Sequence, residues 1–289
     1  MVDTQTKAVA VTDLRAQVRN AALRSLARSV GRSALVGLST LVIVLVIWIL
    51  VVTFSGVSTF VTKNPLDVFE FLFVDEDAGE NRAVLLTQLG ITLGHASIGF
   101  ISGLVVAIIG AIIFRLSKGA ESALMPVAML LRSVPLIALA PVIILIFGYK
   151  SDVTTGVIGG IVVLFPALVT IAVGLKSTSP QMLDVVSVYG GNIFTAVRKV
   201  ALPGALPSLF AAIRISVPGA ITGALLSEML STGTGLGRTA VVYATQAKFA
   251  DLWASVVAVT AVALLLYIVV QILESIVLSR MGMSTERRN

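Results

Sequence analysis

Residues 153–175 read VTTGVIGGIVVLFPALVTIAVGL, a stretch without a charged side chain. Because an α-helix rises about 1.5 Å per residue, about 20 apolar residues cross the ~30 Å hydrocarbon core of a membrane. Five further stretches are long and apolar enough, or nearly so: residues 34–55, 86–114, 123–148, 209–230 and 252–279. None of them shows the ten-residue alternation of a membrane β-barrel. We therefore predict an all-α polytopic membrane protein with six transmembrane helices.

The composition of the chain agrees with a membrane protein and excludes several other classes. Of the 289 residues, 57% are hydrophobic and 12% are charged, which is about half the charged fraction of a soluble domain. The sequence has no cysteine, so disulfides, thiolate metal sites and a cysteine nucleophile are excluded. His95 is the only histidine, which excludes a multi-histidine metal site. The first apolar run starts near residue 34 and is too long for a cleavable signal peptide.

The positions of lysine and arginine predict how the chain crosses the membrane. These residues concentrate in the N-terminal tail, after the second and fourth runs, and near the C-terminus: Lys7, Arg15, Arg19, Arg24, Arg28, Arg32, Arg115, Lys118, Lys176, Arg198, Lys199, Arg280, Arg287 and Arg288. The segment after the first run is mainly acidic. Since basic segments stay in the cytoplasm, we expect a multi-pass membrane protein with both termini cytoplasmic. This asymmetry accounts for the net charge of +6, so we expect no nucleic-acid partner.

The chain divides into a cytoplasmic basic tail, residues 1–33, and a transmembrane domain, residues 34–289. Between Thr12 and Arg32 the tail has arginines four residues apart and a separate stripe of apolar side chains. Two interpretations remain open: a basic helix that lies on anionic headgroups, or a solvated tail that obeys the orientation rule. After the first run, Asn64–Pro65 predicts the N-cap and first residue of a short external helix.

The segment between the fourth and fifth runs, residues 176–208, is too polar to cross a membrane and carries helix signals. Ser179–Pro180 predicts the cap and first residue of a helix, with Asp184 near its positive end. Gly190–Gly191 predicts the end of this helix, and Asn192 predicts the cap of a second one. The apolar side chains of these helices would be awkward in water. They either dock in a groove of a partner protein or lie on the lipid surface.

This segment resembles the EAA loop of ABC importer permeases, whose pattern is Glu-Ala-Ala, three residues, Gly, nine residues and Ile-x-Leu-Pro. Asp184–Val186 stand at the Glu-Ala-Ala positions, Gly190 at the glycine, and Val200–Pro203 at the end, with the spacing intact. The departures are aspartate for glutamate and valine for both alanines. The resemblance implies a type I importer permease with a cytoplasmic coupling helix between spans 4 and 5. It implies contact with the ATPase for eight residues: Asp184, Val185, Val186, Tyr189, Gly190, Gly191, Leu202 and Pro203.

The resemblance extends from about Leu86 to Leu278 and is greatest to the nitrate/sulfonate/taurine group. It rests there on the stretch from Leu131–Pro135 through Phe147–Gly148, on Ser227–Met229 and on Gly235–Gly237. It implies a place in the bacterial cytoplasmic (inner) membrane. It implies alternating access for a small solute, an extracytoplasmic substrate-binding protein, ABC ATPase subunits and a second permease copy, most simply in a homodimer. A nitrate, sulfonate or taurine-like anion is the first expectation, and pyrimidine-type or other small solutes remain open.

The chain itself is not expected to be an enzyme. It has no Gly-Lys pair and therefore no Walker-type phosphate loop, so ATP and its magnesium ion would bind the partner ATPase, and no cofactor is expected in this chain. One alternative is an ion-coupled secondary transporter, which would need intramembrane carboxylates. Another is an intramembrane enzyme, which would need a cluster of titratable groups. The apolar runs offer few carboxylates and no such cluster.

Charged residues in or near the apolar runs are candidates for the translocation pathway, because such charges usually face protein or water. We select Arg132 and Glu228, together with Pro135. Arg132 would attract an anion, or would bond backbone carbonyls at a helix break. We expect Glu228 mainly to fix the glycine-rich turn after the fifth run, His95 to pack or to be hydrogen-bonded, and Arg214 to be interfacial.

Prolines and glycines within the runs predict where helices are interrupted and where they pack closely. Prolines interrupt helices, here at five positions: Pro126, Pro135, Pro141, Pro166 and Pro218. Glycines four residues apart let helices pack closely, here in four pairs: Gly90 and Gly94, Gly99 and Gly103, Gly156 and Gly160, and Gly219 and Gly223.

Overall fold

The computed structural model describes residue 37 and residues 39–282, and every regular element among them is a helix. The chain separates into two units, one ending at Asp67 and one beginning at Val68. The labelled helices are α2 (Pro65–Phe73), α3 (Ala78–Leu116), α4 (Lys118–Ser133), α5 (Leu136–Phe147), α6 (Asp152–Lys176), α7 (Pro180–Val188), α8 (Ile193–Ala196), η1 (Val197–Ala201), α9 (Leu202–Gly204), α10 (Leu206–Ser227), η2 (Glu228–Thr232), α11 (Leu236–Thr245) and α12 (Phe249–Arg280). The basic tail predicted for residues 1–33 lies outside the described residues.

The first unit contains an apolar helix, Ser39–Phe54, and the start of α2. The side chain of Asn64 accepts hydrogen bonds from the backbone N–H groups of Leu66, at 2.7 Å, and of Asp67, at 3.0 Å. In return, the carboxylate of Asp67 accepts from the N–H of Asn64 at 2.8 Å. These bonds satisfy N–H groups that a helix start leaves free. The prediction that a helix starts at Pro65 behind an Asn64 cap is confirmed.

Four described helices are long and apolar enough to cross a membrane: α3, α6, α10 with η2, and α12. They contain the predicted runs 86–114, 153–175, 209–230 and 252–279. The helices Ser39–Phe54 and α5 are apolar but shorter. The all-α membrane class is thus shown, while the count of six spans stays a prediction.

The predicted run 123–148 is not one continuous helix. Helix α4 ends at Ser133 and α5 begins at Leu136, so the expected interruption at Pro135 is confirmed. The other four prolines lie inside helices, and interruption there was wrong: Pro126, Pro141, Pro166 and Pro218. At two of them the hydroxyl of a threonine one turn later donates to the carbonyl of the proline itself, from Thr170 to Pro166 and from Thr222 to Pro218. A membrane helix tolerates proline where packing against neighbouring helices accommodates the missing N–H.

The core of the second unit is a close crossing of α3, α6 and α10, which form its most extensive contacts. A Cβ atom placed on Gly99 of α3, or on Gly223 of α10, would lie 2.7 Å from the Cα of Gly159 of α6. The three backbones therefore meet where no side chain fits. Close packing at Gly99 and Gly223 is confirmed. At Gly90 and Gly94 it is not, because nothing lies within 4 Å of a Cβ at either position.

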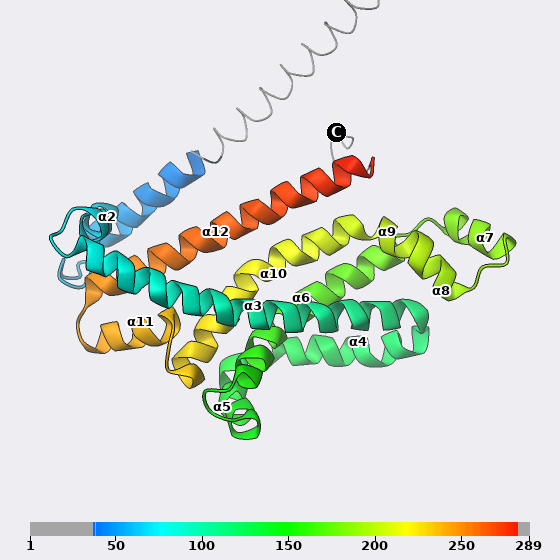
Figure 1. Ribbon diagram of the computed structural model, residues 1–289, viewed down its shortest axis with the longest axis horizontal. Helices are drawn as coiled ribbons and strands as arrows, with labels where there is room; N and C mark the ends of the chain where they lie inside the picture. The colour runs from blue at the N-terminus through cyan, green and yellow to red at the C-terminus, as the bar shows by residue number, and fades with distance from the viewer. Residues whose placement is uncertain (1–36, 38, 283–289) are drawn as a thin grey trace, which may run out of the picture. The chain divides into compact units, whose positions relative to one another are not determined.

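Within the second unit, the two ends of the helix bundle carry different elements (Figure 1). Helices α7, α8 and α9 lie at the end where α3, α6 and α12 finish and α10 begins, and α11 lies at the other end. The side chains of Lys176, in the last turn of α6, and Glu121, in the first turn of α4, form an ion pair at the first of these ends. Arg115 and Arg280 lie in the last turns of α3 and α12. Basic residues that the orientation argument assigned to the cytoplasm thus share one end of the bundle.

Candidate functional site

Residues 179–204, which we call the protruding segment, contain the predicted ATPase-coupling residues. Helix α7 begins at Pro180, where the carbonyl of Ser179 accepts from the N–H groups of Met182 and Leu183 at 3.1 and 3.3 Å. The predicted helix start, with Ser179 at the N-cap and Pro180 directly after it, is confirmed, but the side chain of Ser179 makes no capping hydrogen bond. Asp184 lies in the second turn of α7, not in the first, so it is not placed at the positive end of the helix as expected.

The corner between α7 and α8 is built as the sequence predicts. Gly190 has a φ of +74°, a conformation that glycine adopts without strain. The N–H of Gly191 donates to the carbonyl of Val186 at 2.8 Å, which closes the end of α7. The side chain of Asn192 accepts from the N–H of Thr195 at 3.0 Å and caps α8. The glycine corner and the Asn192 cap are both confirmed.

The corner exposes large apolar side chains. Val188 is 83% exposed, Tyr189 is 87% exposed and Phe194 is 64% exposed. Met182 and Val185 are each more than half exposed. Val188 and Phe194 were not among the predicted contact residues. Both lie two residues from the corner, Val188 before Gly190 and Phe194 after the Asn192 cap, and this closeness is the signal that could have identified them.

The predicted coupling residues separate into two groups. Asp184, Val185, Tyr189 and Gly190 are exposed, and Val186 and Gly191 are partly covered. Leu202 and Pro203, in contrast, lie where the segment returns to the bundle: Leu202 packs against a core that includes Phe114, Leu175 and Ala201. The end of the EAA-like pattern therefore fixes the protruding segment to α3 and α6. Its start lies on the exposed part.

At the opposite end of the bundle, the carboxylate of Glu228 is completely buried. One of its oxygens lies 2.8 Å from Nδ1 of His95. The other accepts from the hydroxyl of Thr92 at 2.9 Å and from the N–H of Gly237 at 2.8 Å. The tautomer of His95 and the protonation of the Glu228 carboxyl group together decide which of the two groups donates in this contact. The expectations that Glu228 fixes the glycine-rich turn and that His95 is hydrogen-bonded are confirmed.

A second bond of Thr92 and one further side chain of α3, Gln88, complete this arrangement. The N–H of Leu236 donates to the hydroxyl of Thr92 at 2.8 Å, and the N–H of Gly235 donates to the side chain of Gln88 at 2.9 Å. Gln88, Thr92 and His95 are spaced four and three residues apart, which places them on one face of α3. That spacing is visible in the sequence, but the partner of this face is 130 or more positions away and could not be identified from it.

The proposed pathway residues are not gathered at one place. Pro135 lies at the break between α4 and α5, where a cavity of about 360 Å³ is lined by Ser133–Leu136, Ile161, Val162, Phe165 and Pro166. The described lining does not include Glu228, whose oxygens face α3 and the start of α11. The side chain of Arg132 is outside the described set. Arg214 of α10 pairs with Glu274 of α12, with Nη1 3.1 Å from a carboxylate oxygen.

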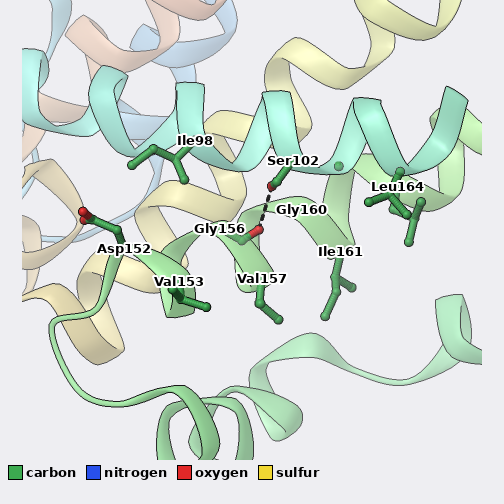
Figure 2. A pocket seen from close by; sticks show the side chains of 11 residues that line it. Ile98, Ser102, Asp152, Val153, Gly156, Val157, Gly160, Ile161 and Leu164 are labelled. Atoms are coloured by element: carbon green, nitrogen blue, oxygen red, sulfur yellow. Dashed lines mark hydrogen bonds between the residues drawn. The ribbon is translucent and has the colours of Figure 1, made fainter. Parts of the chain in front are cut away.

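A larger groove, of about 500 Å³, lies between α3 and α6 (Figure 2). Its lining is almost wholly apolar or glycine, with Asp152 at one end as the only charged side chain among the lining residues. The hydroxyl of Ser102 donates across it to the carbonyl of Gly156 at 2.9 Å. Because the hydroxyl of Ser102 already donates to a backbone carbonyl, this groove offers few hydrogen-bond donors to a polar solute. It has the chemistry of a surface that packs against hydrocarbon or another helix.

Comparisons with known proteins agree with this architecture. Residues 99–283 match the family described as "Binding-protein-dependent transport system inner membrane component". The chain is 27% identical to a probable ABC transporter permease protein of Haemophilus influenzae over 68% of this chain and 77% of that protein. It is 28% identical to the putative aliphatic sulfonates transport permease protein SsuC of Bacillus subtilis over 70% of this chain and 71% of the relative.

A relative that is named for a different substrate is also similar. The formylaminopyrimidine transport permease protein ThiX of Halalkalibacterium halodurans is 32% identical over 54% of this chain and 62% of that protein. The fold resembles that of a chain in the crystal structure of an amino acid ABC transporter with histidines, with a TM-score of 0.56 and 15% identity, covering 76% of this chain and 99% of the other. The chain therefore belongs to the family of binding-protein-dependent transport system inner membrane components, the permeases of ABC importers.

Proposed function

We propose that this permease imports a small solute by alternating access, driven by ATPase subunits that dock on the protruding segment. The observation that carries this proposal is the exposure of Val188 and Tyr189 beside the glycine corner. Covering a large apolar side chain contributes about 1.5–3 kcal/mol. Two adjacent exposed side chains of this kind suit a groove on a partner protein.

Sequence and architecture support a complex in which the permease passes the solute and a separate ATPase subunit binds ATP. The chain lacks a Walker-type phosphate loop, so ATP and magnesium would be held by the partner. Because α7 and α8 share their end of the bundle with the basic helix ends, this end would be cytoplasmic, and both termini would be cytoplasmic too. The α11 end would then face the extracytoplasmic binding protein. A second copy of this chain would supply the second docking segment and the other wall of the pathway.

The relatives are named for the transport of small solutes, some of which are anions and some of which are not. Relatives are named for aliphatic sulfonates, taurine and nitrate, and others for formylaminopyrimidine and riboflavin. We propose a small anion, with Arg132 attracting it and the helix break at Pro135 lining its route. Replacing Arg132 by glutamine should then raise the apparent KM for the anion without changing the amount of ATPase that is bound.

The docking assignment is tested by the double variant Val188→Asp, Tyr189→Asp. The two charges cannot enter an apolar groove, so the amount of ATPase that co-purifies with the permease from its source membranes should fall about tenfold or more. The matched control is Ser187→Ala, which changes an exposed polar residue of the same helix and should retain the ATPase. Equal recovery of the ATPase with all three proteins would contradict the docking assignment. ATP-independent uptake by the purified permease in liposomes would instead indicate an ion-coupled transporter.

A further inference from the structure

Four side chains fix the beginning of α11, and we call them the α11 clamp: Gln88, Thr92, His95 and Glu228. Three consecutive backbone N–H groups, those of Gly235, Leu236 and Gly237, donate to Gln88, Thr92 and Glu228 in that order, at 2.8–2.9 Å. A helix start normally satisfies such groups with its own cap residue or with water. Here α3 and η2 supply all three acceptors.

The clamp depends on a side chain of this length that ends in two polar atoms, because these atoms bond groups from two other elements. Thr92 and His95 approach Glu228 from α3, and Gly237 approaches it from α11. A shorter side chain, or one without a polar end, would leave buried polar groups without a partner, which is costly. The turn has space for the Glu228 carboxyl group only because residue 235 is glycine. A Cβ atom at this position would overlap that carboxyl group. Gly235 also has a φ of +87°, which disfavours any other residue.

Helix α11 is held at its other end as well. It finishes at Thr245, and α12 begins at Phe249 after a tight turn in which Ala247 has a φ of +58°. The N–H of Lys248 donates to the carbonyl of Tyr243 at 2.9 Å and closes this turn. Helix α11 thus bridges α3 and α12 at the end of the bundle away from the protruding segment (Figure 1).

We propose that Glu228 is a positioning residue for transport, which makes α3, α10 and α11 move as one body. The inference rests on the proposed function, because the α11 end is then the end at which solute is received. ATP-driven closure at the protruding segment reaches that end only through helices that move together. If α11 were not fixed to α3 and α10, movement of the protruding segment would not set the position of α11 at the end that receives solute.

The first experiment measures the position of α11 directly. The chain has no cysteine, so Leu85→Cys, Thr234→Cys provides one pair of labelling sites. Leu85 lies one turn before Gln88 on α3, and Thr234 precedes Gly235. Nitroxide labels at these sites should give a narrow distance distribution by pulsed electron paramagnetic resonance. In Glu228→Ala the distribution should broaden about twofold or more. An unchanged distribution in Glu228→Ala would overturn the clamp.

The second experiment separates a positioning role from a need for charge. In Glu228→Gln the amide oxygen can still accept from Gly237, and the amide N–H can donate to Nδ1 of His95 in the tautomer that leaves this nitrogen unprotonated. The complex purified with its ATPase should therefore hydrolyse ATP at nearly the natural rate in Glu228→Gln. In Glu228→Ala the rate should fall about threefold or more, with the ATPase still bound. Equal loss in both variants, or no loss in either, would contradict the positioning role.

Failure of this inference can be told apart from failure of the proposed function. If no ATPase co-purifies with the unaltered permease, the proposed function fails, while the distance measurement still tests the clamp on the permease alone. If the ATPase is bound and the distance between the labels shifts when ATP is added, α3 and α11 do not move as one body. An unchanged distance on ATP addition supports the inference.

Discussion

At one end of the helix bundle the buried carboxylate of Glu228 is bonded to Thr92, His95 and Gly237, whereas at the other end Val188 and Tyr189 are 83% and 87% exposed. The α11 end therefore has its polar groups inside, paired by the chain itself. The protruding segment has large apolar side chains that the described residues leave exposed. This difference motivates the proposal that the first end is complete in one subunit and that a partner covers the second.

The two ends also differ in what a substitution should do. A change at the α11 end should lower the stability of the isolated permease, because it leaves a buried group unpaired. A change at the protruding segment should leave that stability unaltered and act on assembly alone. The predictions below test this contrast, beginning with the packing on which the α11 end depends.

The largest effect is expected for Gly159→Leu at the crossing of α3, α6 and α10. A Cβ there would already lie 2.9 Å from the Cα of Gly99, and leucine adds three more carbons. Forcing these helices apart should cost about 3 kcal/mol and separate Thr92 from Glu228. The fraction of protein that elutes as a single species in detergent measures this effect. Gly90→Leu is the control, since it meets open space and should elute normally; equal behaviour of the two variants would refute the close crossing.

A smaller effect is expected for Thr92→Val, which removes a hydroxyl at nearly constant volume. The N–H of Leu236 loses its acceptor and Glu228 loses a donor, at a cost of about 1–3 kcal/mol. Thermal unfolding of the purified permease should show a lower midpoint. Thr92→Ser keeps the hydroxyl and should unfold close to the natural temperature. If valine and serine behaved alike, the hydroxyl would have no role in the clamp.

The smallest effect on stability is expected for Val188→Ser, Tyr189→Ser. Both side chains are exposed, so the unfolding midpoint of the isolated permease should change by an amount that corresponds to less than about 0.5 kcal/mol. The same variant should bind less ATPase. A large loss of stability in the absence of the ATPase would show that the protruding segment is part of the core.

The sequence predicted those features that depend on neighbouring residues or on long apolar runs. The membrane class, the helix start behind Asn64, the cap at Asn192 and the left-handed corner at Gly190 are local, and each is confirmed. Ser179 has the same cap chemistry, yet its hydroxyl does not cap α7. The residue type decides whether a side chain is able to accept a capping hydrogen bond. The backbone conformation decides whether that hydrogen bond forms.

Features that depend on tertiary contact could not be predicted in the same way. Among the five prolines, only Pro135 separates two helices, and the helix continues through the other four, which a membrane protein tolerates where neighbouring helices pack against the site. Glu228 was correctly assigned to the glycine-rich turn, since Gly237 is nine residues away. Its partners on α3 lie more than 130 residues earlier, and a single sequence does not indicate such a pairing.

The most direct test of the account is the protection of single cysteines at the two ends by the ATPase. In Tyr189→Cys, binding of the ATPase should slow labelling by a maleimide at least about tenfold, because the protruding segment becomes covered. In Thr234→Cys, at the α11 end, the labelling rate should be the same with and without the ATPase. Labelling of the Tyr189→Cys protein at an unchanged rate in the ATPase complex would contradict the claim that this segment is completed by its partner.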